Sequence, residues 1–187
     1  MQHSGTVLLE TERLILRQFR EGDASDMYHN WASSQNVTKY LTWPPHQSAE
    51  VSQMVITSWI EGYSSLSNYQ WCMEYKENHQ AIGSFGIVHM DENTQAVEIG
   101  YCIGEDYWNK GITSEAFKRV IQFLFDEVGC NRIYARHDVN NPNSGKVMIK
   151  SGLEYEGTLI EGGKNNTGIC DVAVYGLTKR MYTNKSK

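Results

Sequence analysis

The sequence has no long run of apolar residues, and its mean hydropathy is −0.51. A helix that crosses a membrane is therefore excluded. Proline is scarce, with 3 residues among 187, and hydrophobic residues make up 40% of the chain, so a long disordered or collagen-like chain is excluded too. The opening residues, Met1–Thr6, contain no basic stretch followed by an apolar segment. We therefore expect no signal peptide, no membrane partner and a cytoplasmic protein.

Concentrated positive charge is also missing. The chain has 17 Lys and Arg against 22 Asp and Glu, a formal net charge of −5. Nucleic acids require a dense basic face, so we expect no nucleic-acid partner. The cysteines form no CxxC pair and have no histidine at ligand spacing, which predicts free thiols and no metal site. These cysteines are Cys72, Cys102, Cys130 and Cys170.

The length predicts one domain over residues 1–187, with loose termini at 1–8 and 180–187. Hydrophobic periodicity and turn residues predict the order of the elements. Strands are expected over Leu14–Arg17, Gln70–Tyr75, Ile82–Met90, Ala96–Ile103, Ile133–Asp138, Leu153–Ile160 and Ile169–Thr178, and helices over Asp23–Trp31, Ser48–Tyr63, Thr113–Val128 and a segment that Gly152 ends. Val51, Met54, Val55 and Trp59 are expected to form the apolar stripe of the second helix.

This order favours an α+β (mixed α/β) domain. Its central sheet would be twisted and mostly antiparallel, with six to seven strands and about four flanking helices. The strand–helix–strand unit from Ala96 to Asp138 would place one pair of strands parallel.

The segment between the strand ending at Ile103 and the next helix is the most informative. Gly111 lies just before that helix, where a residue without a side chain lets the backbone approach a ligand closely. The N–H groups at a helix N-terminus have no intrahelical partners and attract anions. The alternative is that Gly111 is needed only for the turn, since the sequence would then be the same. The segment is not a P-loop, since no GxxxxGK[ST] occurs.

Residues Tyr107–Ala116 resemble the pyrophosphate loop of the GNAT acetyltransferases, which reads (Gln/Arg)-x-x-Gly-x-(Gly/Ala). Trp108, Gly111 and Thr113 stand at its three marked positions. A tryptophan at the first is typical of the ribosomal-protein (Rim-type) N-terminal acetyltransferases. Thr113 departs from Gly/Ala, and it would either bond a phosphate or push the pyrophosphate outward.

Other segments resemble the same subgroup, in order, along nearly the whole chain. They are Thr11–Arg17 for its opening strand, Tyr40–Pro45 for its acceptor-side loop, Ile82–Gly86 and Val97–Tyr101 for its central hairpin, Asn141–Ser144 and Lys150–Leu153 for its second cofactor motif, and Asp171–Leu177 for its last strand.

The resemblance implies a GNAT-like fold and acetyl-CoA as cosubstrate, without a metal. The pantetheine arm would lie along the strand at Tyr101 and bond to Asn141, and the pyrophosphate would meet the N–H groups of Lys110–Thr113. Lys110 would add charge there or be a solvated loop residue. The implied cofactor-binding residues are Tyr101, Cys102, Ile103, Trp108, Asn109, Lys110, Gly111, Ile112, Thr113, Ser114, Asn141 and Ser144.

The reaction implied is direct attack of a primary amine on the acetyl thioester in a ternary complex. Glu98 is the candidate base, because a carboxylate in an apolar strand is costly unless it is partnered or useful. An outward-facing strand glutamate is the alternative. The family's usual tyrosine acid would fall at Met148, which cannot donate a proton. Ser144 is the candidate acid by resemblance to the subgroup, and its alternative role is a helix N-cap.

The acceptor implied first is the N-terminal α-amine of a protein such as a ribosomal protein. Tyr40, Trp43 and His46 are the candidate acceptor-pocket residues. A small amine such as a polyamine, an amino acid or an antibiotic is a second reading, and acidic pocket residues would favour a cationic one; Glu10, Glu50, Glu61 and Asp91 are available. A non-catalytic acyl-CoA-binding module is a third. The subgroup also makes a homodimer an open expectation.

Overall fold

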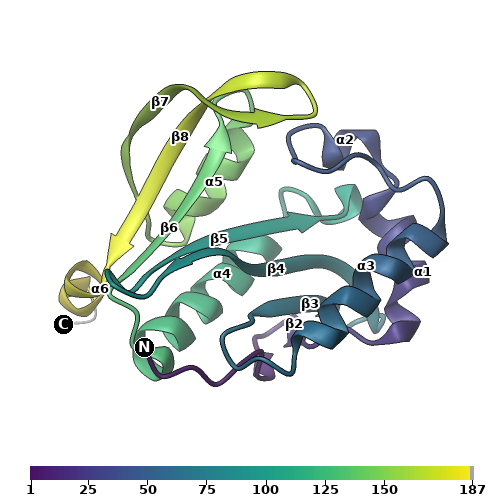
Figure 1. The fold of residues 1–187 in the computed structure, drawn as a ribbon, viewed down its shortest axis with the longest axis horizontal. Coiled ribbons are helices and arrows are strands. Elements are labelled where there is room, and N and C mark those ends of the chain that lie inside the picture. Colours follow the sequence, from purple (N-terminus) through teal and green to yellow (C-terminus); the bar gives the residue numbers. More distant parts are fainter. Residues whose placement is uncertain (186–187) are drawn as a thin grey trace.

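The computed structural model describes residues 1–185 and contains an eight-stranded sheet in the order β1-β2-β3-β4-β5-β6-β8-β7 (Figure 1). Among the strands of these described residues only β5 and β6 pair in parallel, so the prediction of a mixed α/β fold with one parallel pair is confirmed. The strand missed by the sequence is β1, which has two residues and so shows no periodicity. The strands are β1 (Leu9–Glu10), β2 (Leu14–Arg17), β3 (Gln70–Tyr75), β4 (Gln80–Asp91), β5 (Ala96–Ile103), β6 (Arg132–Asp138), β7 (Glu154–Asn165) and β8 (Gly168–Thr178).

Helices cover both faces of the sheet. One core cluster joins α4 to the sheet, and a second lies where α1 and α3 cross β3 and β4 on the other face (Figure 1). None of the helices in residues 1–185 is long and apolar enough to cross a membrane. They are α1 (Ala24–Met27), α2 (Gln35–Thr38), α3 (Ala49–Gly62), α4 (Ile112–Phe123), α5 (Pro142–Lys150) and α6 (Lys179–Lys185), with π-helical turns extending α1 to Ala32 and α4 to Val128.

The long helix α4 follows its sequence pattern closely. Its apolar residues recur at helical spacing and Ala116, Phe117 and Val120 are fully buried. The helical segment ends at Gly129, whose φ of 77° is the left-handed conformation that glycine adopts at a helix C-terminus.

The apolar stripe predicted for α3 is confirmed at Val55 and Trp59, which pack against the second core cluster, and is wrong at Met54. Met54 is 72% exposed, whereas Ser52 and Ile56 are fully buried. Ser52 can be buried because its hydroxyl lies 2.8 Å from Nδ1 of His46, which satisfies both groups. Periodicity in the sequence identifies the apolar side of a helix. Which residues of that side are buried depends on the elements that pack against the helix, and the sequence pattern does not show those.

The parallel pair β5–β6 is short, and this positions the functional site. Its register runs only from Ala96–Arg132 to Glu98–Tyr134. Beyond Glu98 the two strands diverge, while β5 stays paired with β4 as far as Ile103 (Figure 1). The backbone groups of β5 that face β6 are therefore left without strand partners over its second half.

Both ends of the chain, which the sequence predicted to be loose, make contacts within the residues that the structure describes. Met1 packs against the core, and the Gln2 N–H donates to the Val128 carbonyl at 2.8 Å. At the other end, α6 packs on the α4 segment, where the Tyr182 hydroxyl donates to Asp126 at 3.0 Å. Residues 186–187 lie outside the described residues.

A buried ion cluster ties β2 to β3, and its Glu74 provides a pH test. Burial raises the pKa of Glu74, but hydrogen bonds from Arg17 and His79 outweigh burial and hold it below its usual 4.5. When the pKa of a carboxyl group is lower in the folded state than in the unfolded state, its ionisation stabilises the fold at pH values above the unfolded-state pKa. That stability is lost as the pH falls through the folded-state pKa.

We therefore expect the free energy of unfolding to fall less steeply between about pH 5 and about pH 3 in Glu74→Gln than in the unmodified chain. Urea denaturation at each pH measures both slopes. Equal slopes would mean that Glu74 contributes nothing to acid sensitivity.

Candidate active site

A first cavity of about 200 Å³ lies between the end of β5 and the starts of α4 and α5, and we call it the α4–α5 cavity. It gathers residues from three separate segments, 37–41, 101–114 and 141–150, because the divergence of β5 and β6 leaves room there. Of the cofactor-binding residues expected from the sequence, all but Lys110 line it: Tyr101, Cys102, Ile103, Trp108, Asn109, Gly111, Ile112, Thr113, Ser114, Asn141 and Ser144. The Lys110 ammonium lies instead 5.8 Å from the ring centre of Tyr107.

The loop before α4 is held in an unusual backbone conformation. Asn109 and Gly111 have φ values of 59° and 75°, and Gly111 is the N-cap of α4. Trp108 fixes the start of the loop, since its indole N–H donates to the Ile103 carbonyl at 2.9 Å. Gly111 has no side chain to cap the helix, so the first N–H groups of α4 remain available to an anionic ligand.

Ser144 is not a helix N-cap, because Asn141 holds that position in α5. Its hydroxyl lies 2.9 Å from the Tyr101 hydroxyl, which also donates to the carbonyl of Ser144 at 3.1 Å. Burial raises the pKa of Tyr101, so this phenol stays protonated at neutral pH. Ser144 thus has a buried hydroxyl partner at the edge of the α4–α5 cavity.

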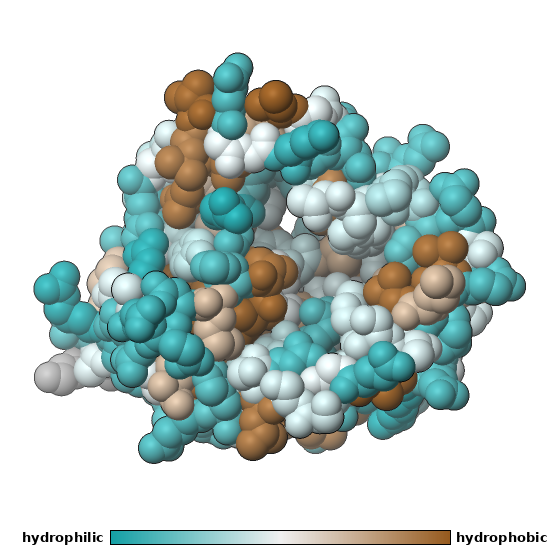
Figure 2. Space-filling model, viewed as in Figure 1, coloured by the Kyte–Doolittle hydropathy of each residue, from teal (hydrophilic) through white to brown (hydrophobic). Residues whose placement is uncertain are grey.

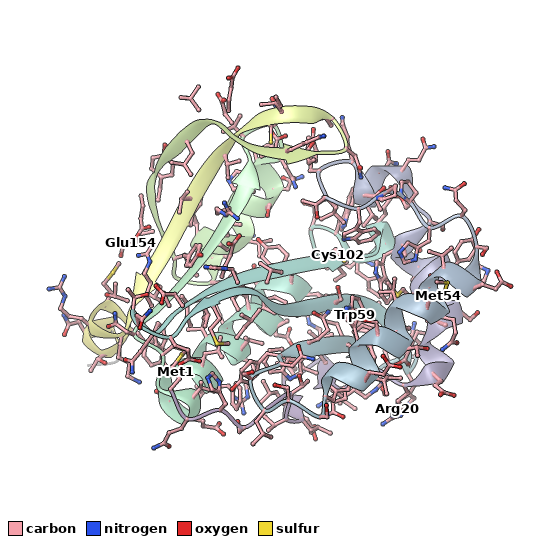
Figure 3. All side chains as sticks on the ribbon, viewed as in Figure 1. Met1, Arg20, Met54, Trp59, Cys102 and Glu154 are labelled. Carbon is pink, nitrogen blue, oxygen red and sulfur yellow. The ribbon has the colours of Figure 1, made fainter. Side chains whose placement is uncertain are left out.

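A second cavity of about 920 Å³ lies on the opposite face of β5, and we call it the β5–β6 cleft. Cys102 of β5 and Trp59 of α3, both labelled in Figure 3, line it. Figure 2 shows the molecule hollowed between the β7–β8 hairpin and the region of α2 and α3. The two cavities share Tyr40, Leu41, Tyr101 and Cys102, so they meet where β5 leaves β6.

Glu98 lines this cleft and is only 7% exposed. The Arg136 guanidinium forms a bidentate ion pair with Glu98, with Nε 2.8 Å and Nη2 3.0 Å from the two carboxylate oxygens. The hydrogen bond to Glu98 raises the pKa of Arg136, which therefore stays charged. Glu98 is the only carboxylate that lines the cleft among the described residues.

Hydrogen bonds join the tip of the β7–β8 hairpin to the loop beside the cleft. Asn166, at the tip of the β7–β8 hairpin, donates through its side chain to the carbonyls of Thr38 and Trp43, both at 2.8 Å. Its N–H donates to the Leu41 carbonyl at 3.1 Å. The hairpin tip and the loop over residues 38–43 are thereby joined across the opening between β5 and β6.

The expected acceptor residues divide between the cleft and the core. Tyr40 and Trp43 line the cleft, but His46 lines neither cavity. His46 is 8% exposed, bonds to Ser52 and packs on Trp43 with ring centres 5.3 Å apart. Burial lowers the pKa of His46, which favours a neutral packing residue.

Other residues of the site were missed from the sequence. Arg136 had no local signal, since it meets Glu98 only through the pairing of β5 with β6. Lys146 and Lys150, which line the α4–α5 cavity, did have one: a spacing of i, i+4 places both on one face of the predicted helix.

Comparisons with known proteins agree with this geometry. A model of the acetyltransferase (GNAT) domain matches residues 13–154. The uncharacterized N-acetyltransferase p20 of Bacillus licheniformis is 32% identical over 178 residues, covering 93% of this chain and 97% of that protein. A ribosomal-protein-serine acetyltransferase of Escherichia coli is 25% identical over 171 residues, covering 88% and 92%. RimL, a ribosomal L7/L12 α-N-protein acetyltransferase solved with coenzyme A, superposes with a TM-score of 0.82 at 17% identity, over 92% of this chain and 98% of that one.

Proposed function

This chain belongs to the GNAT acetyltransferase family, and on that premise we propose that it transfers acetyl from acetyl-CoA to the N-terminal α-amine of a protein. The observation that carries the proposal is the meeting of two cavities at Tyr101 and Cys102, one on each face of β5. A cosubstrate in one and an acceptor in the other would come together at the strand, as direct transfer in a ternary complex requires.

The α4–α5 cavity suits acetyl-CoA, which supplies the acetyl group when bound. The first N–H groups of α4 offer donors to the pyrophosphate, and Gly111 leaves space for close approach. Lys146 and Lys150 add positive charge at the same cavity. The unpaired backbone of β5 beyond Glu98 offers amide partners to the pantetheine arm, in the manner of an added strand, and an N–H there would stabilise negative charge on the acetyl oxygen.

In the β5–β6 cleft, we assign Glu98 the task of taking a proton from the acceptor amine, directly or through a water. Arg136 holds the carboxylate in place, and each oxygen keeps a lone pair for a further hydrogen bond. An α-amine has a pKa of about 8 and a lysine amine a pKa of about 10.4, so the α-amine needs less assistance to lose its proton.

The charges in the cleft favour a peptide acceptor over a polyamine. A polyamine carries several positive charges, whereas Glu98 is already paired with Arg136. Glu10, Glu50, Glu61 and Asp91, the acidic residues available for a cationic acceptor, line neither cavity. The name of the Escherichia coli relative, a ribosomal-protein-serine acetyltransferase, points in the same direction.

We assign the Ser144 hydroxyl the donation of a proton to the departing thiolate, with water replacing the proton on Ser144 so that no serine alkoxide remains. Ser144→Ala should lower kcat by about threefold to tenfold, a modest loss because a thiolate is a good leaving group. Its effect on the free energy of unfolding should stay below about 1 kcal/mol, since the Tyr101 hydroxyl keeps its bond to the carbonyl of residue 144. Initial rates and urea denaturation measure the two effects, and a stability loss with kcat unchanged would limit Ser144 to packing.

The proposed function is tested by following release of the CoA thiol from acetyl-CoA. Peptides that begin with serine or alanine are compared with the same peptides blocked at the α-amine and with a panel of polyamines, amino acids and aminoglycosides. We expect turnover with the free peptides and none with the blocked ones. Turnover with small amines alone would reassign the acceptor, and no turnover with any amine would favour a binding module.

A further inference from the structure

Arg13, immediately before β2, contacts the loop before α4, which lies about a hundred residues further along the chain. Its Nη1 donates to the Lys110 carbonyl at 3.0 Å, and its Nε and Nη2 lie 2.8 and 2.7 Å from the Glu115 carboxylate. One guanidinium therefore holds a loop carbonyl and a side chain of the first turn of α4.

Further hydrogen bonds join Glu115 to the turn that contains Thr11 and Arg13. One of its oxygens accepts from the Thr11 hydroxyl at 2.5 Å and from the Arg13 N–H at 2.9 Å. Burial raises the pKa of Glu115, but these hydrogen bonds and Arg13 outweigh it and hold the pKa below its usual value. The carboxylate is thus charged at neutral pH, with both oxygens turned toward Arg13 and Thr11.

The arrangement has two consequences for the N-terminus of α4. An unpaired carboxylate in the first turn would repel an anion bound there, and Arg13 neutralises it. The bond to the Lys110 carbonyl also fixes the peptide unit next to Gly111, which sets the direction of the following N–H groups. Arginine suits this task because its planar fork bonds to several acceptors at once, whereas a lysine is a single point charge.

We propose that Arg13 is a positioning residue for the pyrophosphate-binding segment Lys110–Glu115, acting through the Lys110 carbonyl and Glu115 rather than by touching acetyl-CoA. This rests on the proposed function, which assigns that segment to the pyrophosphate. Arg13 does not line the α4–α5 cavity, in agreement with an indirect role. Its influence should therefore reach the phosphate end of the cosubstrate and leave the thioester end unchanged.

Calorimetric titration of CoA into the protein tests the proposal by measuring Kd. Arg13→Gln should raise Kd by about tenfold, since one lost set of charge-assisted bonds loosens the loop. Arg13→Lys should recover at most about a third of that loss, because it keeps the charge without the fork. The matched control is Lys76→Gln: Lys76 bonds to Glu10 and to the Thr11 carbonyl in the same turn but not to the loop. It should leave Kd within about twofold.

A second measurement separates positioning from a general structural effect. The acetyl thioester of pantetheine lacks the pyrophosphate, so its kcat/KM in Arg13→Gln should stay within about twofold of the unmodified chain. Equal losses with acetyl-CoA and acetyl-pantetheine would overturn the proposal in favour of a structural staple. Full rescue by Arg13→Lys would overturn it in favour of direct charge attraction.

The failure of this proposal is distinct from failure of the proposed function. Wild-type CoA affinity in Arg13→Gln would remove Arg13 from cofactor positioning and leave the acetyltransferase assignment intact. No CoA binding by the unmodified chain would overturn both, because the loop would then have no pyrophosphate to hold.

Discussion

Glu98→Gln should lower kcat by at least about tenfold and leave the Kd of acetyl-CoA within about twofold. The substitution keeps the size of the side chain and removes its negative charge, and with the charge its ability to take a proton. The α4–α5 cavity, which we propose for the cosubstrate, lies across β5 from Glu98, so the affinity for acetyl-CoA should survive. Single-turnover rates and calorimetric titration measure the two quantities separately.

Because Glu98 forms an ion pair with Arg136, the rate of Glu98→Gln needs a control for the loss of that pair. Glu98→Gln leaves the guanidinium with a weaker partner, and that alone could disturb the cleft. The double variant Glu98→Gln, Arg136→Gln removes the unpaired charge as well. A rate that stays low in the double variant identifies Glu98 as the proton acceptor, whereas recovery would assign the loss to the stranded arginine. Unchanged turnover in Glu98→Gln itself would remove Glu98 from the mechanism.

Arg17→Met should destabilise the fold by about 3–5 kcal/mol. Arg17 is 6% exposed and bonds to both oxygens of Asp23, at 2.7 and 2.8 Å, and to Glu74. Burial lowers the pKa of Arg17, but the hydrogen bonds to Asp23 and Glu74 outweigh it and raise the pKa above its usual value. Its removal would leave two buried carboxylates without a counter-charge.

Arg132→Met is the matched comparison for stability. Arg132 also grips a carboxylate with both terminal nitrogens, but the side chains of Arg132 and Glu156 are 29% and 36% exposed. Solvent screens such a pair, so its loss should cost below about 1 kcal/mol. Urea denaturation of both variants gives the comparison. Similar small losses would mean that the buried cluster does not stabilise the fold.

Sequence reasoning succeeded where the signal is local. The helix expected over Thr113–Val128 and the glycine before it each depend on a few neighbouring residues, and the structure confirms these elements. Most of the lining of the α4–α5 cavity followed from the resemblance because β5, the loop after it and the start of α4 are continuous in the chain, and the resemblance supplied Asn141 and Ser144 as a separate motif.

It failed where a contact joins distant segments. The bidentate ion pair between Glu98 and Arg136 depends on the register of β5 and β6. The link between the hairpin tip and residues 38–43 depends on the single side chain of Asn166. Ser144 was expected as an acid or a helix cap, yet its partner is a tyrosine 43 residues away, which no local pattern indicates. His46 was placed in the acceptor pocket by resemblance, but in the structure it is buried and bonds to Ser52.

The most direct test of the central claim is the affinity of a bisubstrate compound. In it, an acetyl linker joins the CoA sulfur to the α-amine of a peptide that begins with serine. If the cofactor and the acceptor meet across β5, this compound should bind about a hundredfold more tightly than CoA, because linking makes the second binding event intramolecular. An isomer linked through a lysine side chain should gain far less. A serine-linked compound that binds no better than CoA would contradict the account.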